Sequence, residues 1–286
     1  MFFFQKAFFL LLLFVGCALI GSINSQPTYN YHACEDQSNE TRNTSFESNL
    51  TVVLGSLSSK ASQNNNFYNY TSNGIYGLFL CRGDANTSTC QSCVSSAAQD
   101  ITSRCPSNRT AIIWFDQCML RYSDTNFFGV EDLSLMVVMW NVQNRTSPDE
   151  TDFGGLGLMN DLIYAALNTN TLYKAGNSSG QVRYGLVQCT RDISTTLCSN
   201  CFKQLMAEAN LCCQAKIGWR VLAPSCNIRY ENYSFFQQPP PQPVSPPPQP
   251  VSPPPQPVPP QPLPNNGETS STFPASAYFG YVKMLM

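Results

Sequence analysis

The feature that most constrains the fold is a pattern of five cysteines that the chain carries twice, displaced by 108 residues. Each copy has the spacing Cys-x8-Cys-x2-Cys-x11-Cys-x12-Cys, and flanking Tyr-Gly-Leu, Arg-Tyr and Phe-Phe segments recur at the same displacement. Self-similarity at a fixed displacement marks repeated structural units, so the middle of the chain is predicted to hold two copies of one domain. The copies are Cys81, Cys90, Cys93, Cys105 and Cys118, and Cys189, Cys198, Cys201, Cys213 and Cys226.

Each copy has the same predicted order of elements. Apolar residues at helical spacing predict two helices per copy, at 46–57 and 93–101 and at 158–166 and 201–209. Runs rich in aromatic and β-branched residues predict strands at 76–80 and 184–188, and strand pairs within 111–122 and 219–230. Helices and strands do not alternate as strict βαβ units, which favours the α+β class with helices against an antiparallel sheet.

The two ends of the chain differ in composition from its middle. Lys6 precedes an apolar run of about a dozen residues, too short for the ~20 that span a bilayer, and this pattern is typical of a secretory signal peptide. The heptad Pro-Pro-Pro-Gln-Pro-Val-Ser occurs twice near residue 245 and favours an extended polyproline stalk that resembles the extensin repeat of plant cell walls. The predicted parts are a signal peptide at 1–25, domains at 26–130 and 131–236, a disordered stalk at 237–266 and a tail at 267–286.

Composition excludes several functions. His32 is the single histidine, which leaves no set for a catalytic zinc or for a Ser-His-Asp site in each copy, so neither an enzyme nor a cofactor is expected. Only 12% of the residues are charged, the net charge is -2 and no basic run occurs, which argues against nucleic acid. The apolar C-terminal segment is short and contains Lys283, so no transmembrane segment is expected in the mature chain.

Secretion determines what the cysteines do. Cleavage after Ser25 removes Cys17 and leaves an even number in an oxidising compartment, which favours disulfides over a metal site or a redox motif. Cys34 has no cysteine counterpart, since Val142 stands 108 residues further on. Cys212 and Cys213 are unassigned: they could bond to each other, pair outside the domain, or remain thiols.

Sites for N-glycosylation agree with an extracellular surface. The candidate acceptors are Asn39, Asn43, Asn49, Asn69, Asn86, Asn108, Asn144, Asn177 and Asn232.

The doubled cysteine motif, with Tyr-Gly-Leu before it and Cys-Asn-Ile-Arg-Tyr-Glu at 226–231, resembles the plant Gnk2-homologous domain, also called the DUF26 or stress-antifungal domain. The family includes an antifungal lectin, cysteine-rich repeat secretory proteins and receptor-like kinase ectodomains. The resemblance implies a five-stranded antiparallel sheet with two helices per domain. It also implies the disulfides Cys34–Cys105, Cys81–Cys90, Cys93–Cys118, Cys189–Cys198 and Cys201–Cys226.

The resemblance also implies where a sugar would bind. The lectin contacts mannose through an Asn after its first cysteine, an Arg seven residues after its fourth motif cysteine and a Glu five residues after its last. In the first domain these positions hold Glu35, Ile112 and Ser123, which do not fit. In the second they hold Arg220 and Glu231, whereas the Asn cannot be placed without the upstream cysteine. The same two residues could instead form a cross-strand ion pair.

Three functions are consistent with these patterns. The preferred hypothesis is a secreted, non-enzymatic recognition module in the plant apoplast that acts in stress or defence signalling. Its partner would be an extracellular glycan, a protein or peptide, a receptor-like protein of the same family, or the cell wall. The alternatives are a mannose-binding antifungal lectin and a structural wall protein that acts through its Pro-rich stalk.

Overall fold

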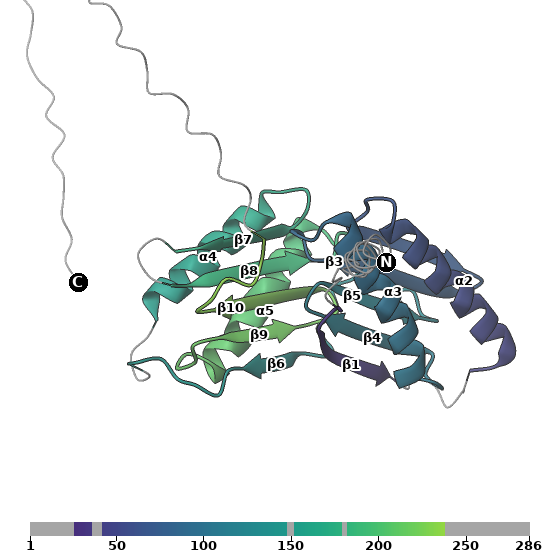
Figure 1. Ribbon diagram of the computed structural model, residues 1–286, viewed down its shortest axis with the longest axis horizontal. Coiled ribbons are helices and arrows are strands. Elements are labelled where there is room, and N and C mark those ends of the chain that lie inside the picture. The colour runs from purple at the N-terminus through teal and green to yellow at the C-terminus, as the bar shows by residue number, and fades with distance from the viewer. Residues whose placement is uncertain (1–25, 36–41, 148–151, 179–181, 238–286) are drawn as a thin grey trace, which may run out of the picture. The chain divides into compact units, whose positions relative to one another are not determined.

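The structure, a computed structural model, describes residues 26–35, 42–147, 152–178 and 182–237 (Figure 1). The predicted signal peptide, the stalk beyond Gln237, the C-terminal tail and the acceptor Asn39 lie outside the described residues. Within them are two five-stranded antiparallel sheets with two helices each, which confirms the predicted α+β class. No helix in the described ranges has the length and apolar character needed to cross a membrane.

The first sheet has the strand order β1-β4-β5-β3-β2, and the second has the matching order β6-β9-β10-β8-β7. The elements of the first half are β1 (Tyr29–Glu35), α2 (Thr44–Ala61), β2 (Phe67–Ser72), β3 (Ile75–Cys81), α3 (Thr87–Arg104), β4 (Thr110–Phe115) and β5 (Cys118–Ser123). Those of the second half are β6 (Val137–Trp140), α4 (Phe153–Leu167), β7 (Tyr173–Asn177), β8 (Tyr184–Cys189), α5 (Thr195–Cys212), β9 (Trp219–Leu222) and β10 (Cys226–Glu231).

Polar side chains begin the helices, and apolar faces bury them. The side chains of Asn43, Asn86 and Ser194 accept a hydrogen bond from a backbone N–H of the first turn of α2, α3 and α5, which satisfies a group that the helix leaves unpaired. The helices of each half lie across one face of their own sheet and form its core. The two edge strands of each sheet are half-exposed; β1, β2 and β7 are mostly polar or aromatic, whereas β6 is apolar.

The repeated Tyr-Gly-Leu has a packing explanation. A Cβ on Gly77 of β3 would meet the side chains of Val53 and Leu57 in α2, and one on Gly185 of β8 would meet Leu162 and Met159 in α4. Glycine therefore lets the first helix of each domain approach a central strand closely.

The repeated Arg-Tyr and Phe-Phe segments also have a common explanation. The guanidinium carbon of Arg121 lies 4.2 Å from the ring centre of Phe127, and that of Arg229 lies 4.1 Å from the ring centre of Phe235. In each domain the last described strand thus holds the segment that follows it through a cation–π contact.

Disulfides tie each second helix to its sheet. The bonded pairs are Cys34–Cys105, Cys81–Cys90, Cys93–Cys118, Cys189–Cys198, Cys201–Cys226 and the adjacent pair Cys212–Cys213. Of the three states left open for Cys212 and Cys213, the structure has the bond between neighbours.

The strand register explains why the second domain lacks a counterpart of Cys34. In the first domain, Cys34 lies opposite Ala111. The repeat of Ala111 in the second domain is Trp219, and Trp140 lies opposite Trp219. The structural counterpart of Cys34 is therefore Trp140 and not Val142, because β6 is shifted by two residues relative to the displacement of 108. Cys213 is the repeat of Cys105, but the second domain has no cysteine at the position of Cys34. Cys213 therefore bonds to its neighbour Cys212.

A third apolar cluster joins the two domains. The first domain contributes buried residues of its sheet face opposite the helices, and the second contributes Leu222 of β9 with the half-buried Val137 and Met139 of β6. The buried side-chain amide of Gln188 also donates a hydrogen bond of 2.9 Å to the carbonyl of Cys81. The first-domain members are Leu78, Leu80, Ile112, Trp114, Met119 and Phe127.

Candidate functional site

Arg220 and Glu231 lie together on the second sheet. Their neighbours Trp219, Val221 and Tyr230 belong to the core under the helices, so strand alternation places Arg220 and Glu231 on the opposite face. The Nη2 atom of Arg220 is 3.9 Å from Oε1 of Glu231. Directly across from Arg220 is Arg229, whose Nε donates a hydrogen bond of 2.9 Å to the same oxygen of Glu231.

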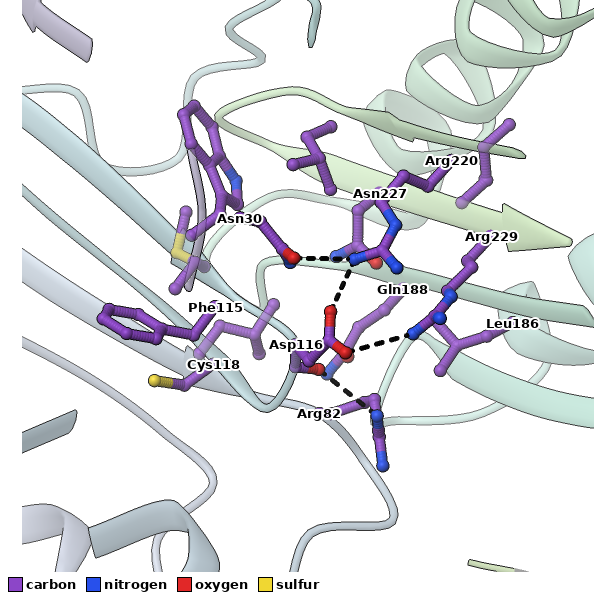
Figure 2. Close-up of a pocket in the computed structure, with 15 residues that line it drawn as sticks. Asn30, Arg82, Phe115, Asp116, Cys118, Leu186, Gln188, Arg220, Asn227 and Arg229 are labelled. Carbon is purple, nitrogen blue, oxygen red and sulfur yellow. Dashed lines mark hydrogen bonds and ion pairs between the residues drawn. The ribbon is translucent and has the colours of Figure 1, made fainter. Parts of the chain in front are cut away.

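This charged group extends into the first domain. Asp116, in the turn between β4 and β5, accepts a 2.5 Å hydrogen bond at Oδ1 from Nη1 of Arg220, and its Oδ2 lies 3.5 Å from Nη1 of Arg229 (Figure 2). The same Nη1 of Arg220 donates a hydrogen bond of 2.8 Å to Oδ1 of Asn30 in β1. Two guanidinium groups therefore meet two carboxylates, and their formal charges balance.

The pKa of Asp116 is set by opposing effects. Burial alone would raise it, but the charges of Arg220 and Arg229 and the hydrogen bonds from Arg220 and Asn30 outweigh burial and hold the pKa of this carboxyl below its usual value. Asp116 therefore remains ionised in mildly acidic surroundings.

The cavity around Asp116 is too small for a ligand. It has a volume of about 50 Å³ and is lined by both domains, with Arg82, Gln188 and Asn227 among its walls (Figure 2). Because one water molecule needs about 10–15 Å³ of such volume, this space holds a few waters at most. We assign it to the packing of the domains.

A larger pocket, which shares Asn30 and Arg220 with this cavity, is lined by both Arg220 and Glu231. Its volume is about 230 Å³. Its walls include Asn141, which follows Trp140 and so occupies the position after the missing cysteine. The sequence alone could not place this Asn, and the strand register does. The lining residues are Asn30, Met139, Trp140, Asn141, Gly218, Trp219, Arg220, Glu231 and Tyr233.

In the first domain, the residues that match Arg220 and Glu231 are buried. Ile112 is 2% exposed within the cluster that joins the domains, and Ser123 is buried and bonded through its hydroxyl to that of Thr110 at 2.7 Å. Glu35 is the half-buried last residue of β1. Apolar packing between the domains thus covers the position that corresponds to the Arg220 pocket.

One group of side chains in the described residues could be considered as a metal site. Atoms of His32, Cys34 and Cys105 lie within 4.8 Å of one another. Both sulfurs are bonded to each other, however, so neither offers the thiolate that a metal would need. This group does not fit a metal.

None of the glycosylation candidates within the described residues is buried. Asn144 and Asn232 line a separate pocket of about 420 Å³ beside Asp152 and Arg183, so glycans on them would cover that pocket. Asn232 is not part of the lining of the Arg220 pocket, although it follows Glu231. A glycan there would extend from the opposite side of the strand.

Three buried or half-buried carboxylates predict acid sensitivity. Burial alone would raise the pKa values of Asp116, Asp132 and Asp152. Hydrogen bonds and neighbouring arginines outweigh burial, so each pKa lies below its usual value. A carboxylate whose pKa is lower in the folded state stabilises the protein fully at pH values above its unfolded-state pKa of about 4. This stabilisation is lost as the pH falls through the folded-state pKa.

We therefore expect the free energy of unfolding to decrease as pH falls below about 4. Asp132→Asn removes one titrating group, whose partner is Arg121 at 2.5 Å, and should flatten this decrease. Urea unfolding of both proteins between pH 5 and pH 2 measures the two slopes. Equal slopes would show that Asp132 does not contribute.

The fold and the site together define a tandem-domain, disulfide-bridged extracellular protein. The sequence profile of the family described as salt stress response/antifungal matches residues 33–125 and 151–233, one match in each domain. The chain belongs to this family, as the cysteine motif predicted.

Secreted proteins are among its relatives. Cysteine-rich repeat secretory protein 38 of Arabidopsis thaliana is 37% identical over 217 residues, which cover 72% of this chain and 84% of that protein. An antimicrobial ginkbilobin-2-like protein of Castanea crenata is 37% identical over 211 residues, which cover 72% of this chain and 88% of that protein. With the disulfides, these relatives identify the chain as secreted, as its signal-like N-terminus predicted.

Receptors are also among the relatives. Cysteine-rich receptor-like protein kinase 25 of Arabidopsis thaliana is 38% identical over 77% of this chain, but this chain spans only 34% of that kinase. The crystal structure of the tandem DUF26 ectodomain of the Arabidopsis thaliana cysteine-rich receptor-like protein PDLP8 matches with a TM-score of 0.63 and 26% identity. The match covers 72% of this chain and 99% of the ectodomain.

Proposed function

We propose that this chain is a non-enzymatic recognition protein of extracellular stress or defence signalling, and that its second domain binds a neutral carbohydrate of the mannose class. The observation that carries the proposal is the meeting of Asn141, Arg220 and Glu231 in one pocket. The antimicrobial relative from Castanea crenata supports a role in defence.

The chemistry of the pocket fits neighbouring hydroxyl groups. The side-chain oxygen of Asn141 accepts a hydrogen bond from the backbone of Gln143 at 2.9 Å, which orients the amide nitrogen as a donor. Arg220 supplies further donors and Glu231 an acceptor, and vicinal hydroxyls need both. Because the carboxylates balance the two guanidinium groups, the pocket favours a neutral ligand over an ion.

Aromatic side chains border these polar groups. Tyr233, which is 48% exposed, lines the same pocket; Trp140 also borders it, but its pairing with Trp219 directs its ring to the helix side of the sheet. The hydroxyl of Tyr233 accepts a hydrogen bond of 3.1 Å from Nη2 of Arg229 and is thereby fixed. An apolar ring surface beside a few placed polar groups is typical of small-ligand sites.

Two variants test the pocket without removing its charges. Asn141→Ser keeps a side-chain oxygen that can accept from the backbone of Gln143, removes the amide donor and adds no charge. A methyl group on Gly218 would collide with the carboxylate of Glu231, so Gly218→Ala should displace that acceptor. We expect each variant to lower the affinity for mannose or mannan about tenfold, which corresponds to one lost hydrogen bond.

Calorimetric titration of the secreted, disulfide-bonded chain with trimmed N-glycans measures this affinity. Gly157→Ala is the matched control, because a Cβ at Gly157 in α4 meets no atom within 4 Å. It should bind sugar as the parent chain does. An absence of heat at millimolar mannose and with mannan would reject the carbohydrate, and a protein or peptide would become the favoured ligand of the recognition module.

A further inference from the structure

The pocket of the second domain depends on side chains of the first. Asn30 of β1 is one of its lining residues, and Arg220 is bonded to Asn30 and to Asp116. Both of these bonds use Nη1 of Arg220, whereas Nη2 is directed towards Glu231 at 3.9 Å. The guanidinium thus has one side held by the first domain and the other side at the pocket.

Asp116 is itself held firmly. Its backbone N–H donates to the carbonyl of Thr28 at 2.8 Å, and its carbonyl accepts from Nη1 of Arg82 at 3.3 Å (Figure 2). The turn that carries the carboxylate is therefore tied to β1 on one side and to the end of β3 on the other. A rigid support of this kind positions a binding group before the ligand arrives.

The carboxylate of Asp116 also limits how Arg220 can pair. Glu231 is the other acidic group near Arg220, and it already accepts from Nε of Arg229. Without the charge of Asp116, both arginines would have Glu231 as their remaining carboxylate partner. Arg220 would then move onto Glu231 and occupy the acceptor that a sugar hydroxyl needs.

We propose that Asp116 and Asn30 of the first domain are positioning residues for Arg220, so that the pocket is a composite site that requires both domains. This inference rests on the proposed function for its ligand. The geometry on which it depends, the restraint of one guanidinium by a carboxylate of another domain, can be measured without any ligand.

Asp116→Asn is the decisive variant, because it keeps the shape and an oxygen acceptor and removes the charge. Asn30→Ala removes the second partner and leaves the charge in place. Asp100→Asn, which alters a carboxylate paired with Arg104 on the surface of α3, is the control. Thermal unfolding confirms that each variant folds.

The first measurement is the ¹⁵N NMR signal of the Arg220 Nη1 group, which donates to Asp116 and Asn30, in the full chain; it is assigned by its loss in Arg220→Lys. We expect a protected, rotationally restricted guanidinium in the parent chain and in Asp100→Asn. In Asp116→Asn its proton exchange should be faster by about tenfold or more, in line with the loss of a charge-assisted hydrogen bond. An unchanged signal in both Asp116→Asn and Asn30→Ala would overturn the inference.

The second measurement is mannan affinity of the same proteins. A loss of about tenfold in Asp116→Asn, with the control unaffected, is the expected result. Unchanged affinity in Asp116→Asn beside a parent chain that binds would overturn positioning while the proposed function stands. If the parent chain binds no sugar, the proposed function fails, and the NMR result alone decides whether Asp116 positions Arg220.

Discussion

Replacing Trp114 with alanine is expected to lower the free energy of unfolding by about 3–5 kcal/mol, the range for removal of a large buried aromatic side chain. Trp114 of β4 is 2% exposed and belongs to the cluster that joins the domains. Leu222 of the second domain is in the same cluster, so the cavity would open between the two sheets. The effect should therefore weaken the contact between the domains as well as the first sheet.

Trp140→Ala is the matched control, because it removes the same side chain from a position that is 52% exposed. Its cost should stay below about 1 kcal/mol. Denaturant unfolding followed by far-ultraviolet circular dichroism, with the disulfides intact, compares the two. An equal or smaller loss for Trp114→Ala would mean that the contact between the domains adds little to stability.

The repeat made the central part of each domain predictable. The helices and inner strands follow from apolar periodicity and from the fixed displacement of 108 residues, and the structure has both helices and strand pairs where the pattern placed them. The edge strands β1, β2, β6 and β7 gave no comparable local signal. Strands β1, β2 and β7 are half-exposed and mix Asn, Ser or Lys with aromatic residues, so pairing with a neighbour, rather than their own pattern, makes them strands. Strand β6 is apolar but only four residues long, which is too short to show a periodicity.

Part of the candidate site could be predicted for the same reason. Arg220 and Glu231 follow cysteines at fixed distances, and the structure brings them within 3.9 Å. Asn141 was missed because its reference cysteine is absent and β6 is shifted by two residues. Only pairing of Trp140 with Trp219 restores the alignment.

Asp116 carried no signal in the sequence beyond that of a turn residue. Its role arises because the second domain packs against the turn between β4 and β5 and brings two arginines to it. Contacts between domains are not encoded in the periodicity of either one. A buried run such as 110–115 indicates that a strand has two covered faces but does not identify what covers the second.

Removing the bond between Cys34 and Cys105 by a double substitution to alanine is expected to cost about 4 kcal/mol. The bond joins β1 to the end of α3 across a sequence separation of 71 residues, and a long closed loop restricts the unfolded chain strongly. Cys213 is the repeat of Cys105, but its bond to Cys212 closes no loop, since the separation is one residue. The same double substitution at Cys212 and Cys213 should cost less than about 1 kcal/mol.

Unfolding of both double variants by denaturant, under non-reducing conditions, gives the two free energies side by side. The comparison is well matched, because one cysteine of each pair ends the second helix of its domain. Similar losses in the two variants would mean that the adjacent bond holds the end of α5 in a way that chain entropy does not describe. The expected difference would show that closure of the long loop between Cys34 and Cys105, and not a bonded cysteine at the helix end, supplies the stability.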